Sequence, residues 1–287
     1  MAFTRKKIDV EFSLANGQFE GGGNTVTISG LRVSASILNL SANSGQAEIA
    51  VYGLPLSMMN QLSTVGMDYA RQYQNHVELR AGSDEEGMTV VWSGDIYIAF
   101  ADMLDMPMVC LRISSRPGAF HAMKPVAPVS IRGSADVSGM MKQLAGQMGF
   151  DFEDAGVQVK LANPYYAGTA WDQAMQIARD AGISLVMDKK TMVIVPPGKS
   201  RKGDVPVIAP WTGMKGYPQF NQNQIVVTSL FNPAVKPFGT VEVHSDLTSA
   251  NGQWVVNKLE YALESMMPHG RWDMIITGIP KGRPTIA

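Results

Sequence analysis

The feature that most constrains the fold of this chain is a change in hydrophobic period along the sequence. In the first third, apolar and polar residues alternate, as at 47–52 and 76–81, which is the period of half-buried strands. Between residues 140 and 178 the apolar residues recur at helical spacing, and alternation returns after the double proline Pro196-Pro197. The sequence therefore predicts a β-rich α+β fold in three parts, with strands at both ends and helices in the middle.

The first part combines short strands with one helix. Leu56, Met59 and Leu62 recur at helical spacing, Pro55 suits a first helical turn, and Gly66 can end a helix. The alternating segments predict strands at 26–29, 47–52, 76–81, 89–92, 95–100 and 108–114. Many short strands with one helix favour a barrel or a sandwich.

The middle part contains two similar helix-strand units. The first apolar stripe ends at Gly149, and the second begins after the N-cap residue Thr169 and ends before Gly182. The stripes consist of Met140, Met141, Leu144, Ala145 and Met148, and of Trp171, Ala174, Met175 and Ala178. Strands are predicted at 150–152, 183–187 and 191–195, so this part is expected to form a small α+β domain.

Proline- and glycine-rich sequence marks the domain boundaries. We expect a first β domain at 1–125, the α+β domain at 126–198, and a linker with a second β domain at 199–287. Further strands are predicted at 224–229, 240–244, 254–263 and 272–278. Residues 196–206 have the composition of a linker, so the basic residues Lys199, Arg201 and Lys202 are predicted to be solvated.

Composition argues against several classes of function. The formal net charge is −1, and no Lys/Arg cluster is present that could grip nucleic acid. Charged residues make up 17% of the chain, against about 25% in globular domains, which suits a subunit covered in an assembly. The single cysteine, Cys110, excludes an intrachain disulfide. No run of 18 apolar residues and no apolar leader occur, so we expect no membrane span and folding in a reducing cytoplasm.

Residues that could carry catalysis do not form a recognisable site in the sequence. His244-Ser245-Asp246 holds the residue types of a catalytic triad, but adjacent strand residues point to opposite faces. The acidic cluster Asp151, Glu153 and Asp154 could serve sugar cleavage, yet a solvated strand edge explains it more simply. The remaining histidines, His76, His121 and His269, stand alone. We therefore predict no catalytic, cofactor or metal residues, and a protein that is not an enzyme.

Two compositional features have a structural and a functional interpretation. Residues 21–23 are three glycines without the Lys and Ser/Thr of a phosphate loop, so a hairpin tip is expected there. The chain has 19 methionines, of which Met140, Met141, Met148, Met175 and Met187 concentrate in the middle part. They could line an adaptable binding groove, although core packing is the favoured interpretation.

Three segments in order resemble the baseplate hub proteins of phage tails. The first contains 47–54, the helix at 55–65, residues 79–82 and the strand 91–96 that ends in Gly94-Asp95-Ile96. The second is the paired helix-glycine-strand unit of the middle. The third contains 229–239, 252–256 and 265–272. The resemblance implies two tail-tube-like β-barrel or sandwich domains with a small α+β domain between them.

The resemblance also implies a role and partners. Such hubs are homotrimers whose two tube-like domains mimic six tube subunits, and they connect the tail tube to the central spike. We expect contacts with the tail tube protein, with other baseplate proteins and with a spike on a separate polypeptide, because the chain ends at Ala287 without a spike extension. DNA would pass through without sequence-specific binding, and the protein would reside in the virion baseplate after assembly in the host cytoplasm.

Two strands are predicted to form interfaces between subunits, and several alternative functions stay open. The two strands at 47–52 and 254–263 are expected to reach neighbouring subunits. The interface residues predicted on them are Ala47, Ile49, Val51, Trp254, Val256, Leu259 and Tyr261. The alternatives are another tail structural protein such as a tube or tube-tip protein, a cell-wall hydrolase, and a ligand-binding module built on the methionine-rich middle part.

Overall fold

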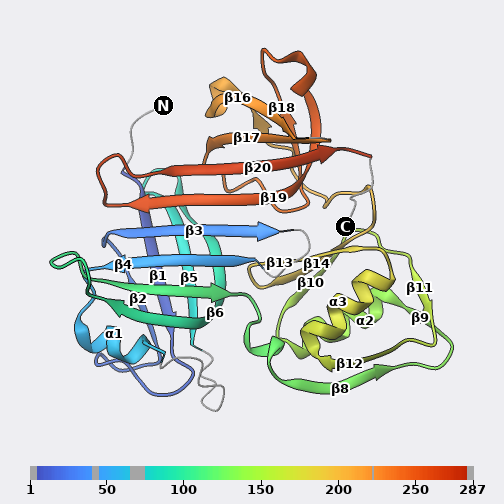
Figure 1. The fold of residues 1–287 in the computed structure, drawn as a ribbon, viewed down its shortest axis with the longest axis horizontal. Coiled ribbons are helices and arrows are strands. Elements are labelled where there is room, and N and C mark those ends of the chain that lie inside the picture. Colours follow the sequence, from blue (N-terminus) through green and yellow to red (C-terminus); the bar gives the residue numbers. More distant parts are fainter. Residues whose placement is uncertain (1–4, 41–44, 65–74, 222, 283–287) are drawn as a thin grey trace. The chain divides into compact units, whose positions relative to one another are not determined.

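Strands dominate the structure, a computed structural model that describes residues 5–40, 45–64, 75–221 and 223–282 (Figure 1). Most of the strands belong to a large antiparallel sheet. The chain divides into two compact units, which are described separately. One unit contains residues 1–38, 46–120 and 261–273, and the other contains residues 39–45, 121–260 and 274–287.

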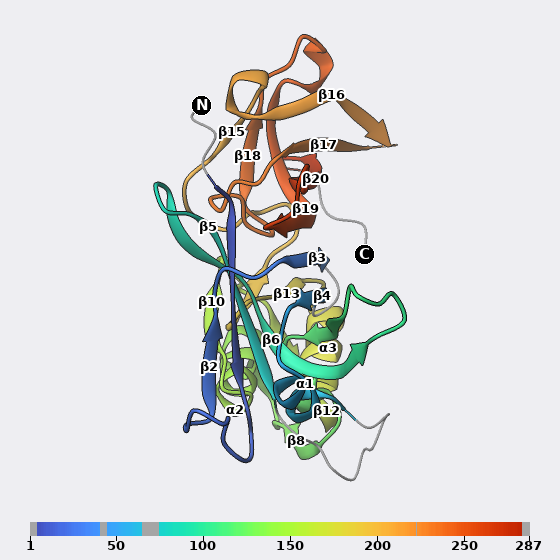
Figure 2. The same ribbon diagram turned by 90° about the vertical axis from the view of Figure 1, so that its left-hand side faces the viewer.

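The first unit is built from long antiparallel strands. Its elements are β1 (Lys7–Ser13), β2 (Thr25–Ile28), β3 (Val33–Leu40), β4 (Gln46–Tyr52), α1 (Leu56–Leu62), β5 (His76–Ser83), β6 (Gly87–Asp102) and β7 (Cys110–Arg116). The strands follow the order β2-β1-β5-β6-β7-β4-β3. Figure 2 shows β1, β2, β5 and β6 running side by side, as their pairing requires.

Alternation along these strands builds the core of the first unit. In β1 every second side chain is buried, and these are Ile8, Val10 and Phe12. Trp92 on β6 is also buried, and its Nε1 donates a hydrogen bond of 3.0 Å to Ser115 Oγ. The indole thus fills the core while its single donor stays satisfied, as a buried tryptophan requires.

Strand β6 runs through Gly94 as one element, although the sequence predicted two strands, at 89–92 and 95–100. A Cβ added at Gly94 would lie 2.8 Å from Ser115 Oγ and 2.9 Å from the carbonyl carbon of Arg116. Glycine therefore permits the close approach of β7 rather than ending the strand.

Helix α1 is short because its backbone leaves the helical region at Ser63, where φ is −65° and ψ is 135°. Met59 and Leu62 are buried, as their helical spacing predicts. The following residue Thr64 donates its N–H to Ala99 O of β6 at 2.7 Å, which ties the end of the helix to the sheet. Val65 and Gly66, to which the predicted helix extended, lie outside the described residues.

The middle part of the chain belongs to the second unit and has the predicted α+β character. Its elements are η1 (Phe120–Ala122), β8 (Pro125–Ser130), β9 (Ser134–Asp136), α2 (Val137–Gln147), β10 (Asp151–Asp154), β11 (Lys160–Ala162), β12 (Tyr165–Thr169), α3 (Ala170–Asp180), β13 (Ser184–Asp188) and β14 (Thr191–Val195). A three-stranded sheet has the order β10-β14-β13, and β9 pairs with β11 and β8 with β12.

This middle part encloses its own apolar core. Helices α2 and α3 lie side by side (Figure 1). Their buried stripes, with Met141, Leu144 and Ile177, pack together with Met187 and Met192 of the small sheet. The methionines predicted to cluster here lie in or against this core, which agrees with the core-packing interpretation.

Local signals define both helices. Thr169 is the N-cap of α3 and forms a capping box with Asp172. The hydroxyl oxygen Oγ1 of Thr169 accepts the backbone N–H of Asp172 at 3.0 Å. Gly149 and Gly182 follow the two helices with φ of 70° and 62°, the left-handed conformation that favours glycine. The predicted helix ends are confirmed, and Asp136, which caps α2, was missed.

The C-terminal part is again β structure. Its elements are β15 (Val207–Ile208), η2 (Pro210–Thr212), β16 (Met214–Asn221), β17 (Gln224–Leu230), β18 (Thr240–Val243), η3 (Thr248–Ala250), β19 (Gly252–Ser265) and β20 (Trp272–Pro280). The turn end of the β19–β20 hairpin belongs to the first unit, where Ser265 Oγ donates to Leu31 O at 3.2 Å. The division at residues 125 and 198, and closure of either β part into a barrel, stay predictions.

Candidate assembly surfaces

The strands predicted to meet neighbouring subunits are present as β4 and β19. Six of the seven predicted side chains are buried within the chain, and Trp254, which donates Nε1–H to Ala250 O at 2.9 Å, is half-buried. The buried ones are Ala47, Ile49, Val51, Val256, Leu259 and Tyr261. The alternating pattern marks the apolar face of a strand, but it does not distinguish a core from an interface. Their contact with a neighbour stays a prediction.

Open strand edges lie elsewhere in the fold. Strand β4 is paired on both sides, with β3 and with β7. The strand order ends at β2 and at β16, each paired on one side. In β16 the register shifts between Lys215 and Gln219, and Pro218 within the shift has no N–H to donate. The β16 edge is therefore poorly suited to backbone pairing, as is usual for protected edges.

Two groups of large apolar side chains are exposed. One group surrounds the connection from β6 to β7, where Leu104 is 94% and Met106 is 75% exposed. The other group is aromatic and lies on η2 and β16, and it comprises Trp211, Tyr217 and Phe220. Neither group was predicted from the sequence. For the group at the β6–β7 connection the sequence did contain a signal, because four of the six residues at 103–108 are Met or Leu.

Arg201 forms an ionic site with two carboxylates in the second unit, which corrects the prediction that it is solvated. Its side chain is 7% exposed. Nε and Nη2 donate to the two carboxylate oxygens of Glu153 at 2.8 and 2.6 Å, and Nη1 donates to Asp188 Oδ2 at 2.6 Å. Burial alone would lower the pKa of Arg201, but the hydrogen bonds and charges of Glu153 and Asp188 raise it. Lys199 and Lys202 are exposed, as predicted.

A small apolar cluster accompanies this ionic site. Val186 of β13 and Val193 and Val195 of β14 are buried together with Phe238 and Val255 from the C-terminal β part. The backbone N–H of Arg201 also donates to Phe238 O at 2.9 Å. The segment 196–206 is thus held against the small sheet and the C-terminal strands, which explains why both belong to one compact unit.

A serine, a histidine and an aspartate that the sequence did not bring together meet at the start of β5. His76 Nε2 lies 2.8 Å from Ser93 Oγ, and His76 Nδ1 lies 3.4 Å from Asp95 Oδ1. A histidine that contacts a serine through one ring nitrogen and an aspartate through the other is the arrangement of a hydrolytic triad. Ser93 is 1% exposed, however, and Asp95 also accepts the N–H of Phe120 at 3.2 Å. A substrate cannot reach this hydroxyl, so the network joins β5 to β6 as a structural link.

The residues weighed as catalytic in the sequence are used structurally. His244 Nε2 lies 2.9 Å from Glu242 Oε1, and the ring is 6.0 Å from that of Trp211. Asp154 accepts the hydroxyl of Ser138 and two backbone N–H groups. Burial opposes ionisation there, but these hydrogen bonds lower the pKa of Asp154. Cys110 is buried in β7, and burial raises the pKa of its thiol.

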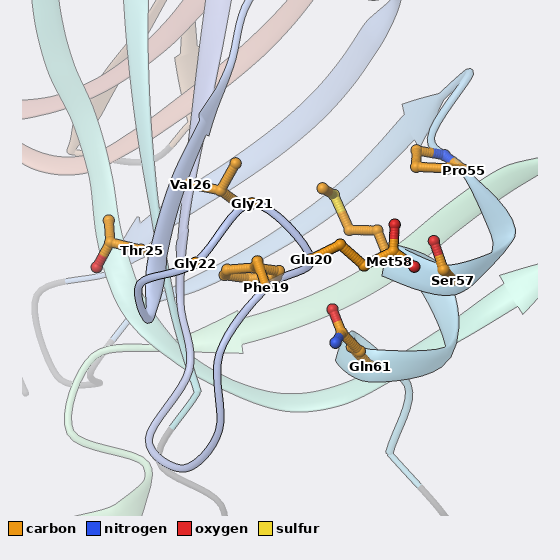
Figure 3. A pocket seen from close by; sticks show the side chains of 10 residues that line it. All are labelled: Phe19, Glu20, Gly21, Gly22, Thr25, Val26, Pro55, Ser57, Met58 and Gln61. Carbon is orange, nitrogen blue, oxygen red and sulfur yellow. The ribbon is translucent and has the colours of Figure 1, made fainter.

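One shallow pocket of about 400 Å³ lies between α1 and the loop before β2 (Figure 3). Phe19, Val26 and Met58 contribute apolar walls, and Glu20 is the only titratable residue in the lining. Gly22, at the predicted glycine tip, has φ of 79° and also lines the pocket. A single carboxylate supplies no acid–base pair. Among the described residues, no group of His, Cys, Asp and Glu could hold a metal ion, and no helix could span a membrane.

Solved structures of similar fold come from tails and related systems. The tail protein from Neisseria meningitidis MC58 has a TM-score of 0.64 at 11% identity, over 98% of this chain and 100% of that one. The 43 kDa tail protein of prophage MuSo2 from Shewanella oneidensis has a TM-score of 0.62 at 9% identity, over 97% and 100%. An E. coli type VI secretion component, described as similar to bacteriophage T4 tail proteins gp27 and gp5, has a TM-score of 0.60 at 9% identity, over 96% and 79%.

The sequence itself matches a family model. No curated protein matches the chain significantly. The model described as baseplate hub gp41, in contrast, matches residues 8–269, nearly the whole length. The match confirms the resemblance predicted from the order of the segments, and it identifies a structural component of a phage tail baseplate. The chain belongs to the baseplate hub gp41 family.

Proposed function

We propose that three copies of this chain form a ring at the tip of the tail tube, joining the tube to the central spike and enclosing part of the DNA channel. One observation carries the proposal. Two β parts, β1–β7 and β15–β20, flank a middle part that has its own core. If each β part is one tube-like domain, three chains supply six similar domains and match a sixfold tube.

Symmetry and open edges support a ring. Among the described residues, strands β2 and β16 are each paired on one side only. A closed ring covers surfaces that a monomer exposes, and cyclic symmetry uses the same contacts in every copy. Within the ring, β4 and β19 lie in the sheets that face neighbouring domains. Six of the seven predicted residues on these strands are buried, so they would support the interface from beneath.

The channel wall is expected to be polar and not basic. A basic wall would hold the phosphates of DNA that has to move through it. The formal net charge of −1 agrees with this requirement. The partners in this proposal are the tail tube protein, a spike protein and other baseplate proteins, and the chain is made and assembled in the host cytoplasm.

We further propose that the chain has no hydrolytic activity. Ser93 is buried, and Glu153 is engaged by Arg201, so neither can act on a cell-wall substrate. Zymography on bacterial cell wall and a peptidase panel should show no turnover. Turnover that disappears in Asp151→Ala or Glu153→Ala would contradict this part of the proposal.

Native mass spectrometry of the purified chain tests the ring directly. The proposal predicts a species with three times the mass of one chain. A hexamer, which would place one tube-like domain per chain in the ring, or a monomer at all concentrations, would overturn it.

A further inference from the structure

The connection from β6 to β7 carries an exposed apolar surface, which we call the methionine loop. It consists of Phe100, Met103, Leu104, Met106 and Met108. Figure 2 shows the connection projecting beyond the strands that it joins. Leu104 is 94% and Met106 is 75% exposed, and an exposed apolar patch is a mark of an interaction site.

Hydrogen bonds within and beside the methionine loop stabilise its backbone. At its base, Arg112 Nε pairs with Asp102 Oδ2, and Asp102 Oδ1 accepts the N–H of Leu104 at 3.2 Å. Met108 donates its N–H to Asp105 O at 2.7 Å. Arg32 Nη1 lies 3.7 Å from Met108 Sδ. A surface fixed before binding loses little conformational freedom on association, which favours a role in recognition.

A second exposed surface, the aromatic edge, lies on the C-terminal β part. It consists of Trp211 on η2 with Tyr217 and Phe220 on β16. Pro218 and the register shift prevent regular backbone pairing along β16, so a partner here would meet side chains. Tryptophan and tyrosine are the residues most enriched at the energetic centres of protein interfaces.

The two surfaces are chemically complementary. Thioether groups pack favourably against aromatic rings, and unbranched methionine side chains adapt to irregular shapes. Within one chain both surfaces are exposed, and each therefore remains available to another copy.

We propose that the methionine loop of one copy packs on the aromatic edge of the next copy around the ring. The contact is heterologous, because it joins two different surfaces, and repetition of such a contact closes a ring of three when successive copies are related by a threefold rotation. It places the first β part of one copy beside the second β part of its neighbour, as alternation around a sixfold axis requires. The inference rests on the proposed trimer and names the surfaces that hold it together.

Charged substitutions on the methionine loop test the contact in the purified full chain. Leu104→Asp combined with Met106→Asp should shift the trimer toward monomer by at least tenfold in sedimentation velocity. Tyr217→Lys should do the same from the opposite surface. Met123→Asp is the matched control, because Met123 is 40% exposed and lies outside both surfaces. All four substituted positions are exposed, so circular dichroism should show unchanged folding.

Directed cross-linking identifies the occupant. In a Cys110→Ala background, chains carrying Met106→Cys are mixed with chains carrying Tyr217→Cys and oxidised mildly. The proposal predicts a disulfide-linked dimer in the mixture and none in either chain alone. A wild-type trimer without this cross-link, or one unaffected by the loop substitutions, would overturn the inference and leave the proposed trimer standing. A wild-type chain that never assembles would overturn both.

Discussion

Arg201 should be one of the most sensitive single positions in the second unit. Arg201→Met keeps the aliphatic stem and removes the guanidinium, which leaves Asp188 and Glu153 without their shared partner. The Asp188 side chain is 13% exposed, so most of its desolvation would be uncompensated. Glu153 is 36% exposed, and water would screen its charge. Breaking a buried pair costs about 3–5 kcal/mol, and with the discount for Glu153 we expect about 2–4 kcal/mol.

Urea unfolding followed by circular dichroism measures this loss. With a slope near 3 kcal/mol per M, the upper end for single domains, the midpoint should fall by about 1 M. Lys202→Met is the control, because Lys202 is exposed in the same segment and its substitution should stay within about 0.5 kcal/mol.

A double-mutant cycle assigns the effect to the ion pair. Asp188→Asn should lose less stability in the Arg201→Met background than in the wild type, because the charge is already unpaired. This coupling between Arg201 and Asp188 should persist at 0.5 M NaCl, since buried pairs are weakly screened. Equal midpoints for Arg201→Met and Lys202→Met would refute the reasoning.

Four further substitutions test local features. Thr169→Ala should lower the stability of the α+β part by about 1 kcal/mol in thermal melts, because the capping box is lost. Tyr166→Phe removes the 2.7 Å hydrogen bond to Asp180 and should cost about 1 kcal/mol. Burial, with help from Asp180, raises the pKa of Tyr166 to about 12. Its contribution is therefore full below about pH 10 and is lost as pH rises through about 12, and the variant should lack this dependence. Gly94→Ala should cost about 1–3 kcal/mol through overpacking, whereas Gly146→Ala, in open space on α2, should stabilise by up to about 1 kcal/mol. Unchanged melting of Thr169→Ala or Gly94→Ala, or alkaline unfolding of Tyr166→Phe identical to the wild type, would contradict these accounts.

Strict periodicity and cap chemistry were the predictable parts of the fold. The pattern at 47–52 nearly matches β4, and Thr169 with Gly182 defines the ends of α3. Strand β1 was overlooked, although Ile8, Val10 and Phe12 alternate in the sequence and are all buried. This signal was available and could have been used.

Other features depend on contacts that a linear pattern does not contain. Arg201 stands among proline, glycine and lysine residues, which predicted exposure. Its partners Glu153 and Asp188 are 48 and 13 residues away in sequence, and their approach follows from the packing of β10 and β13. The interface residues stay a prediction for a related reason, because an apolar strand face looks the same whether it meets the core of its own chain or a neighbour.

The ring at the tip of the tail tube is the central claim, and a symmetry-free reconstruction of the tail by electron microscopy tests it most directly. We expect three copies of the chain in one ring, with the two β parts alternating around the channel and the methionine loop of each copy against β16 of the next. Six copies with one β part each in the ring, or a tail tip that lacks the chain, would contradict the account.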